Sequence, residues 1–87
     1  MRITSVVWDE ETAEHLARHG VRPEEAEQVC QGRPYTLRSH HGRYLVLGQT
    51  EAGRYLTVIL APLGGGRARI ITARMMDEAE RRQYLRR

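Results

Sequence analysis

Apolar and polar positions divide the chain into a helical first third and a strand-rich remainder. Glu10–His19 carries apolar residues at helical spacing, with Asp9 before it as a plausible N-cap and Gly20 after it in the position of a C-terminal cap. A second helix is predicted to begin at Pro23, which suits a first helical turn, and to stop at Gly32. The first 32 residues therefore predict two short helices.

From residue 35 onward the apolar positions alternate, as expected for strands with two different faces. This pattern predicts strands at Tyr35–Ser39, Arg43–Gln49, Tyr55–Ala61 and Ala68–Arg74, and Ile3–Trp8 is a further short β-prone run. His41-Gly42 and Ala52-Gly53 mark hairpin turns, whereas Leu63–Gly66 indicates a looser connection. Both faces of Tyr55–Ala61 are apolar, so we expect this strand to be central in an antiparallel sheet.

A last helix is predicted to start near Asp77, a candidate N-cap, with Glu80 and Tyr84 four residues apart on one face. The complete order is β-α-α-β-β-β-β-α. The fold class expected from it is α+β: an antiparallel sheet packed with helices.

Length and composition indicate one soluble domain spanning residues 1–87. No apolar run is long enough to span a membrane, and the start, Met1–Ser5, is too short and too quickly charged for a signal peptide. The expected compartment is therefore the cytoplasm. The single cysteine, Cys30, excludes an internal disulfide and a cysteine-based zinc site.

All 14 basic residues are arginine, a bias that a GC-rich genome explains without any selection for function. The positions of the charges carry more information than their number. Residues 1–32 hold seven acids and three arginines, whereas residues 33–87 hold four acids and 11 arginines. This asymmetry suggests that the C-terminal part faces a polyanion, and the alternative is a dipolar surface without a ligand.

The sequence lacks complete motifs for a metal-dependent site or for a catalytic nucleophile. His15 and His19 are four residues apart on a predicted helix, but a hydrolytic zinc site needs a third ligand, and the HExxH pattern is absent. Cys30 lies on the apolar side of its helix, where thiols are usually inert. Gly64–Gly66 lacks the Lys-Ser/Thr ending of a phosphate-binding loop. We therefore expect no metal and no cofactor.

Metal-free RNA cleavage needs a base, an acid and a cation that stabilises the phosphate. The chain offers side chains suited to these roles at His19, Glu80, Tyr84, Arg43, Arg54 and Arg74. Glu80 beside its arginine neighbours could equally be a solvated helix face. Trp8, at a strand end, could stack on a base or close the core.

The order and spacing of several short motifs resemble the BrnT family, the toxin half of a bacterial type II toxin–antitoxin pair. The motifs span nearly the whole chain: Trp8-Asp9, Arg18-His19-Gly20-Val21, Glu24-Glu25-Ala26, Arg43-Tyr44, Gly48-Gln49-Thr50, Gly53-Arg54-Tyr55-Leu56-Thr57-Val58, Arg69-Ile70-Ile71-Thr72-Ala73-Arg74 and Glu80-Arg81-…-Tyr84. The family commonly has Lys-His-Gly-Val, Arg-Ile-Ile-Ser-Ala-Arg and Glu-Arg-…-Tyr at the corresponding places.

The resemblance implies a RelE-like fold and a ribonuclease that blocks translation by cutting RNA. It also implies a tight complex with a small antitoxin. Carried over by position, the functional residues implied are Trp8, Asp9, His19, Arg74, Glu80 and Tyr84, with Arg43 and Arg54 as second choices. We expect His19, Arg74, Glu80 and Tyr84 to be catalytic and Trp8, Asp9, Arg43 and Arg54 to bind RNA, without assigning base and acid.

The chain departs from the family pattern in ways that keep other functions open. The lysine usual shortly after Trp-Asp is missing, and His15 stands where the family often has asparagine. A second hypothesis is therefore a module that binds RNA or an antitoxin and has lost nuclease activity. The acidic first third and the basic remainder are also compatible with a homodimer.

Overall fold

The computed structural model describes residues 3–87, so Met1 and Arg2 of the segment weighed above as a signal peptide lie outside it. Within this range the elements are β1 (Ser5–Val7), α1 (Glu10–Ala17), α2 (Pro23–Gln31), β2 (Tyr35–Arg38), a 3₁₀ turn η1 (His40–Gly42), β3 (Tyr44–Gln49), β4 (Tyr55–Gly64), β5 (Arg67–Met75) and α3 (Glu78–Arg86). The predicted α+β class and the order of its elements are confirmed. None of the helices in this range is long and apolar enough to cross a membrane.

The helices begin at the caps that the sequence predicts. The Asp9 carboxylate accepts a hydrogen bond of 2.8 Å from the Thr12 amide at the start of α1. Asp77 does the same for the Glu80 amide at the start of α3. Helix α1 ends at Ala17, two residues before the predicted end, and the chain then turns through Gly20, whose φ of +71° favours glycine.

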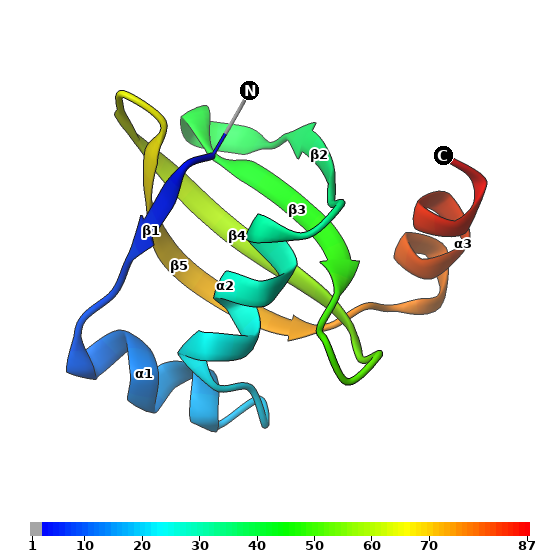
Figure 1. Cartoon of the computed structure of the whole chain (residues 1–87), viewed down its shortest axis with the longest axis horizontal. Coiled ribbons are helices and arrows are strands. Elements are labelled where there is room, and N and C mark those ends of the chain that lie inside the picture. Colours follow the sequence, from blue (N-terminus) through cyan, green and yellow to red (C-terminus); the bar gives the residue numbers. More distant parts are fainter. Residues whose placement is uncertain (1–2) are drawn as a thin grey trace.

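The strands form one sheet in the order β1-β5-β4-β3-β2 (Figure 1). The four strands from β2 to β5 are antiparallel to their neighbours, and β1 joins the edge of β5 in parallel. Strand β4 lies between β5 and β3, as its two apolar faces predict. The loose connection expected at Leu63–Gly66 is wrong: β4 continues to Gly64, and Gly65 and Gly66, both with positive φ, make a tight turn into β5.

Helices α1 and α2 pack against one face of the sheet, where the main core lies (Figure 1). Leu56, Val58 and Leu60 of β4 are fully buried there, in the alternation expected of a strand. Leu16 of α1 and Val29 of α2 are buried against them. This core fixes α1 beside β5, which positions the residues described next.

The opposite face of the sheet is covered at one end by α3. The Tyr84 ring, 5% exposed, meets the Tyr55 ring edge-on at a centroid distance of 6.0 Å, and Leu47 and Thr57 are buried beside them. Farther along this face, Ile59 is half-buried. We call this face of the sheet the α3 face. It carries the arginine that the sequence analysis favours most.

Candidate active site

Arg74 and Glu80 form a bidentate ion pair where β5 passes into α3. Arg74 Nη1 lies 2.7 Å from Glu80 Oε1, and Nη2 lies 2.8 Å from Oε2. Glu80 Oε1 also accepts hydrogen bonds from the Thr57 hydroxyl and the Asp77 amide, both at 2.9 Å. The carboxylate of Glu80 therefore fastens the first turn of α3 to β4 and β5 at once.

These contacts keep Glu80 ionised near neutral pH. Burial acts to raise its pKa, but hydrogen bonds from Arg74, Asp77 and Thr57 act in the opposite direction and leave the pKa below its usual value. A carboxylate that accepts four hydrogen bonds and has a lowered pKa is a poor proton carrier in this conformation. The Glu80 carboxylate is instead well placed to hold the Arg74 guanidinium in a fixed orientation.

The guanidinium of Arg74 keeps part of its binding capacity. Three of its five N–H groups are used, two by Glu80 and one by the Met75 carbonyl at 3.3 Å. Among residues 3–87, the Nε–H and the second N–H of Nη2 have no hydrogen-bond partner. They lie on the same edge of the guanidinium, so this edge can bind two oxygens of a phosphate while Glu80 holds the other edge.

A β-bulge places further basic groups on the same face as Arg74. In the register of β4 and β5, Thr57 faces Arg74, Ile59 faces Thr72 and Leu60 faces Ile70, so Ile71 is an extra residue. Arg69 and Thr72 are three residues apart and would lie on opposite faces of a regular strand. The bulge brings both, with Arg67, to the α3 face.

Helix α1 brings two imidazoles to the side of β5. His15 Nε2 lies 3.0 Å from Thr72 Oγ1, and the His15 and His19 rings meet at a centroid distance of 5.3 Å. The Gly20 carbonyl that follows His19 accepts a hydrogen bond from Arg54, and Arg54 also contacts Met75. The end of α1 is thereby tied to the end of β5, next to Arg74.

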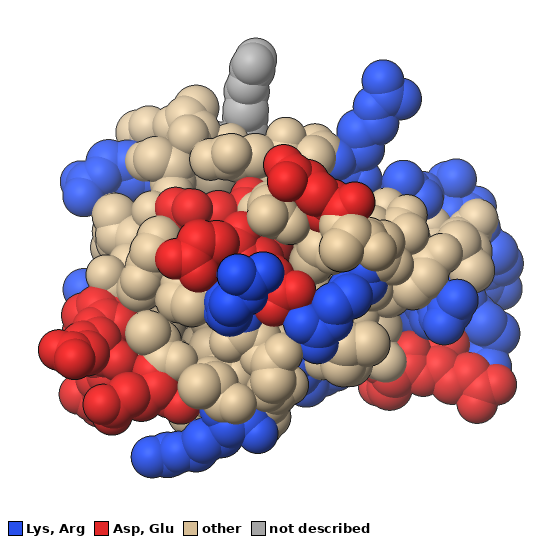
Figure 2. Space-filling model, turned by 60° about the horizontal axis from the view of Figure 1, so that its bottom comes forward, with Lys and Arg blue, Asp and Glu red and all other residues tan. Residues whose placement is uncertain are grey.

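A groove of about 630 Å³ runs between α1 and β5. Its walls are formed by Asp9, Glu11, Thr12, Glu14, His15, Arg18, Arg69, Ile70, Ile71 and Thr72. Figure 2 shows acidic side chains gathered at the end of the molecule where α1 lies and arginines predominating at the end where α3 lies. The groove mixes both signs of charge, and Thr72 on its wall precedes Arg74 by two residues.

Comparisons with known proteins identify the family and the fold of this chain. A family model described as the ribonuclease toxin BrnT of a type II toxin–antitoxin system matches residues 8–80. This chain belongs to the BrnT family. The crystal structure of the Brucella abortus ribonuclease toxin BrnT is similar, with a TM-score of 0.69 and 19% identity over 85% of this chain and 97% of that chain. No curated relative matches at a significant level.

Membership in the BrnT family assigns the chain to ribonuclease toxins, and a type II toxin implies an antitoxin partner. The matched range holds seven of the eight residues singled out from the sequence, while Tyr84 follows it. Tyr84 is buried between Tyr55 and Arg87, whose guanidinium carbon lies 3.8 Å from the centroid of the Tyr84 ring. This packing gives Tyr84 a clear role in docking α3.

Two of the predicted arginines stand apart from Arg74. Both Nη nitrogens of Arg54 have partners: the Glu25 carboxylate, the Gly20 carbonyl and the Met75 sulfur. Arg43 is exposed just before β3, near the pairing of Tyr44 with Leu60, and so lies toward the other end of the sheet. Arg54 thus holds elements together, and Arg43 is separate from the Arg74 corner.

At the N-terminal end of the site, Trp8 is half-buried against the core, and Asp9 caps α1. Cys30 is buried, and burial raises the pKa of its thiol to about 12, which fits an inert core cysteine. The groove adds Arg69 and Thr72, which are not among the site residues predicted from the sequence. The resemblance included both within Arg69–Arg74, but no sequence pattern announced the bulge.

Proposed function

We propose that this protein is an endoribonuclease toxin that cleaves RNA without a metal ion and thereby inhibits translation in the cytoplasm. The observation that carries the proposal is the free edge of Arg74 on a guanidinium held by Glu80. Family membership supports the reaction class, and the arginines on the α3 face support an RNA substrate. A cognate antitoxin would neutralise the toxin.

The reaction needs little more than positioned polar groups. The 2′-hydroxyl loses a proton and attacks the adjacent phosphorus, and the 5′-oxygen of the next nucleotide gains a proton as it leaves. Negative charge gathers on the two remaining phosphate oxygens. Arg74 would meet these oxygens with its Nε–H and Nη2–H, and its pKa, raised by Glu80, keeps it charged.

Proton transfer is better suited to the histidines of α1 than to Glu80 or Tyr84. Glu80 accepts four hydrogen bonds, and Tyr84 is packed between two side chains. His19 is exposed, and His15 contacts Thr72, two residues from Arg74. In this proposal Arg74 binds the scissile phosphate, Glu80 positions Arg74, and His15 and His19 carry the protons.

The proposal is tested by RNA cleavage with the purified protein and by growth arrest on induced expression. Arg74→Ala is expected to lose both, while Arg82→Ala, the removal of an exposed arginine of α3 paired to Glu78, is the matched control. Cleavage should persist in a chelator. Thermal unfolding of each variant separates loss of chemistry from loss of fold. Equal cleavage by the wild type and Arg74→Ala would exclude the role given to Arg74.

A second candidate function is a binding module without nuclease activity. It is favoured by the same contacts that occupy Glu80, because a corner locked by hydrogen bonds can serve recognition without moving protons. Such a module would bind RNA in a salt-dependent way, or bind the antitoxin, and form no cleavage product. The cleavage assay separates the two candidates directly.

A further inference from the structure

The groove between α1 and β5 combines features that the cleavage chemistry alone does not require. It is larger than a gap between packed side chains, at about 630 Å³, and lies beside the strand that carries Arg74. Thr72 on its wall and Arg74 share the α3 face and are two residues apart, about 7 Å at the rise of a strand. The groove therefore begins about one nucleotide step from the proposed phosphate position.

Asp9 and Arg69, which carry opposite charges, both line this groove but form no ion pair with each other. Hydrogen bonds from the Thr12 amide and hydroxyl, with a smaller contribution from the charge of Arg69, lower the pKa of Asp9. Yet among the ion pairs of residues 3–87, neither Asp9 nor Arg69 is included. Thr12 uses one carboxylate oxygen of Asp9, Oδ1, and leaves Oδ2 open. A carboxylate oxygen and a guanidinium are thus available to the same ligand.

We propose that this groove binds the base of a nucleotide flanking the cleaved bond, and that it selects guanine. Single-stranded RNA is commonly read by hydrogen bonds to the edges of splayed bases. Guanine offers two adjacent acceptors, O6 and N7, which fit the fork of an arginine, and two adjacent donors, N1–H and N2–H, which fit a carboxylate. Arg69 binds the first edge, and the open Oδ2 of Asp9 accepts hydrogen bonds from the second.

The other bases fit the lining less well. Adenine places an amino donor where guanine has O6, so it would oppose the guanidinium of Arg69. Cytosine and uracil lack the N7 acceptor and cannot meet the arginine fork in the same way. The inference rests on the proposed nuclease function, since it names the nucleotide beside the phosphate that Arg74 would hold.

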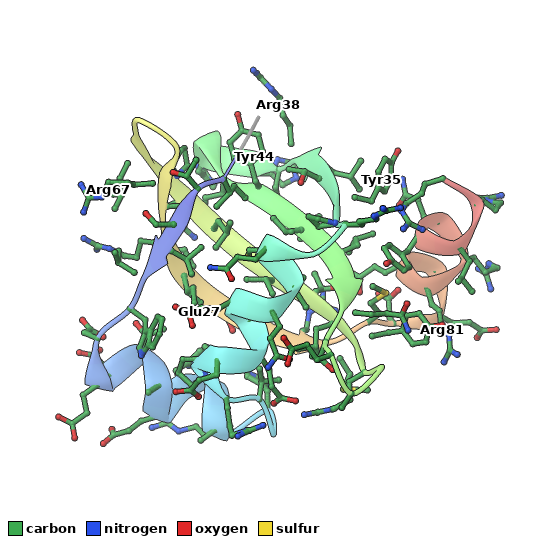
Figure 3. The ribbon with its side chains drawn as sticks, in the orientation of Figure 1. Glu27, Tyr35, Arg38, Tyr44, Arg67 and Arg81 are labelled. Atoms are coloured by element: carbon green, nitrogen blue, oxygen red, sulfur yellow. The ribbon has the colours of Figure 1, made fainter. Side chains whose placement is uncertain are left out.

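Arg67 provides a matched control for Arg69. Both side chains lie on the α3 face of β5, but Arg67 is not among the residues that line the groove. Figure 3 shows Arg67 near the β1 end of β5 and Arg81 at the opposite side of the molecule, on α3. Arg67→Gln and Arg69→Gln remove the same charge from the same strand face, so only the second should affect base selection.

The experiment uses short oligonucleotides with a single ribose in an otherwise 2′-deoxy backbone, so that one bond can be cut. Each of the four bases is placed in turn on either side of this bond. The wild type should cleave the guanine substrate roughly 10-fold to 100-fold faster than the others, the discrimination expected of one bidentate contact. Arg69→Gln should lose this preference, whereas Arg67→Gln should keep it and slow all substrates alike.

Substitution with 7-deazaguanine, which lacks N7, provides a second measurement. It should slow the wild type and Arg67→Gln but leave Arg69→Gln unchanged. Asp9→Asn should also lose the guanine preference, since an asparagine can keep the cap of α1 without the negative charge. A wild type without guanine preference, or Arg69→Gln with an intact preference, would overturn the inference.

Failure of the proposed nuclease function can be distinguished from failure of guanine binding in the groove. If the wild type cleaves no RNA, the proposed function fails, and base selection is then measured by equilibrium binding of the same oligonucleotides. Tighter binding of guanine that depends on Arg69 would support the groove as a base-binding site. Equal affinity for the four bases would reject it.

Discussion

Two arginine–glutamate pairs lie on opposite faces of this sheet, and they differ in what they leave available. The Arg54 and Arg74 side chains are exposed to almost the same extent, 35% and 38%. Each contacts its glutamate at 2.7 Å. Arg54, however, uses both Nη nitrogens for protein partners, whereas Arg74 keeps a complete edge open on the α3 face. Exposure alone would not separate a structural arginine from a ligand-binding one.

The glutamates differ as well. Glu25 is 7% exposed and accepts hydrogen bonds from Arg54 and from the Arg22 amide, so it is an anion inside the fold. Glu80 is 15% exposed and lies at the first turn of α3. The first pair ties α2 to the loop before β4 and, through Gly20 and Met75, to the end of β5. The second pair presents a guanidinium toward solvent.

Arg74 and Arg54 should differ most in their effect on the rate of RNA cleavage. We expect Arg74→Ala to lower kcat about 10²-fold to 10³-fold, since one charge-stabilising donor is removed. Arg54→Ala, assayed at a temperature where it remains folded, should lose much less because its guanidinium does not reach the phosphate. Single-turnover cleavage with saturating RNA measures both. A larger loss for folded Arg54→Ala would reverse the assignment.

Stability should show the opposite order. Arg54→Ala removes the closest ion pair of Glu25 and leaves this buried carboxylate only the Arg22 amide and the exposed Arg22 guanidinium, 3.9 Å away. We expect a loss of about 2–4 kcal/mol in the free energy of unfolding. Arg74→Ala should cost about 1 kcal/mol, because Glu80 is less buried and keeps the Thr57 hydroxyl and the Asp77 amide. Urea denaturation measures both values. Replacing Glu25 and Arg54 together by Leu and Met should recover part of the first loss.

The pH dependence of stability should follow both glutamates. Burial acts to raise the pKa of Glu25, but the Arg22 amide and Arg54 outweigh it, so the pKa of Glu25, like that of Glu80, lies below the ordinary glutamate value of 4.5. A lowered folded-state pKa gives stability that is present above pH 4.5 and is lost as the pH falls through the folded value. We expect the free energy of unfolding to decline in that range. Glu25→Gln and Glu80→Gln should each flatten the decline; an unchanged slope in both would contradict the assignment.

Much of the fold follows from local signals in the sequence. Asp9, Gly20, Pro23 and Asp77 mark helix ends by caps that depend on neighbouring residues, and alternating apolar residues identify the strands. The tight turn after Gly64 has no such local signal, and the pattern Leu63–Gly66 predicts a loose connection instead. Three consecutive glycines indicate freedom of the backbone but do not say which turn the paired strands will select.

The site is less predictable because it depends on pairings between distant residues. Glu80 and Arg74 are close in sequence, and their contact could be anticipated, but the third partner, Thr57, is 23 residues away from Glu80. Arg54 could be judged free or paired only once Glu25 was placed beside it. The bulge at Ile71 depends on the register with β4, so the shared face of Arg69 and Arg74 has no local signature.

A third ion pair calibrates the other two and should give the smallest effect. Glu78 and Arg82 are four residues apart on α3, 3.4 Å from each other and 90% and 64% exposed. Water screens such a pair, so Arg82→Ala should change the free energy of unfolding by less than about 0.5 kcal/mol and leave cleavage unaltered. Arg81→Ala, at the preceding position, should lower the free energy of unfolding slightly more, by about 0.5–1 kcal/mol. The reason is that the Arg81 guanidinium carbon lies 4.1 Å from the centroid of the Tyr55 ring. If Arg82→Ala matched Arg54→Ala in urea, burial of the glutamate could no longer explain why the Arg54–Glu25 pair matters.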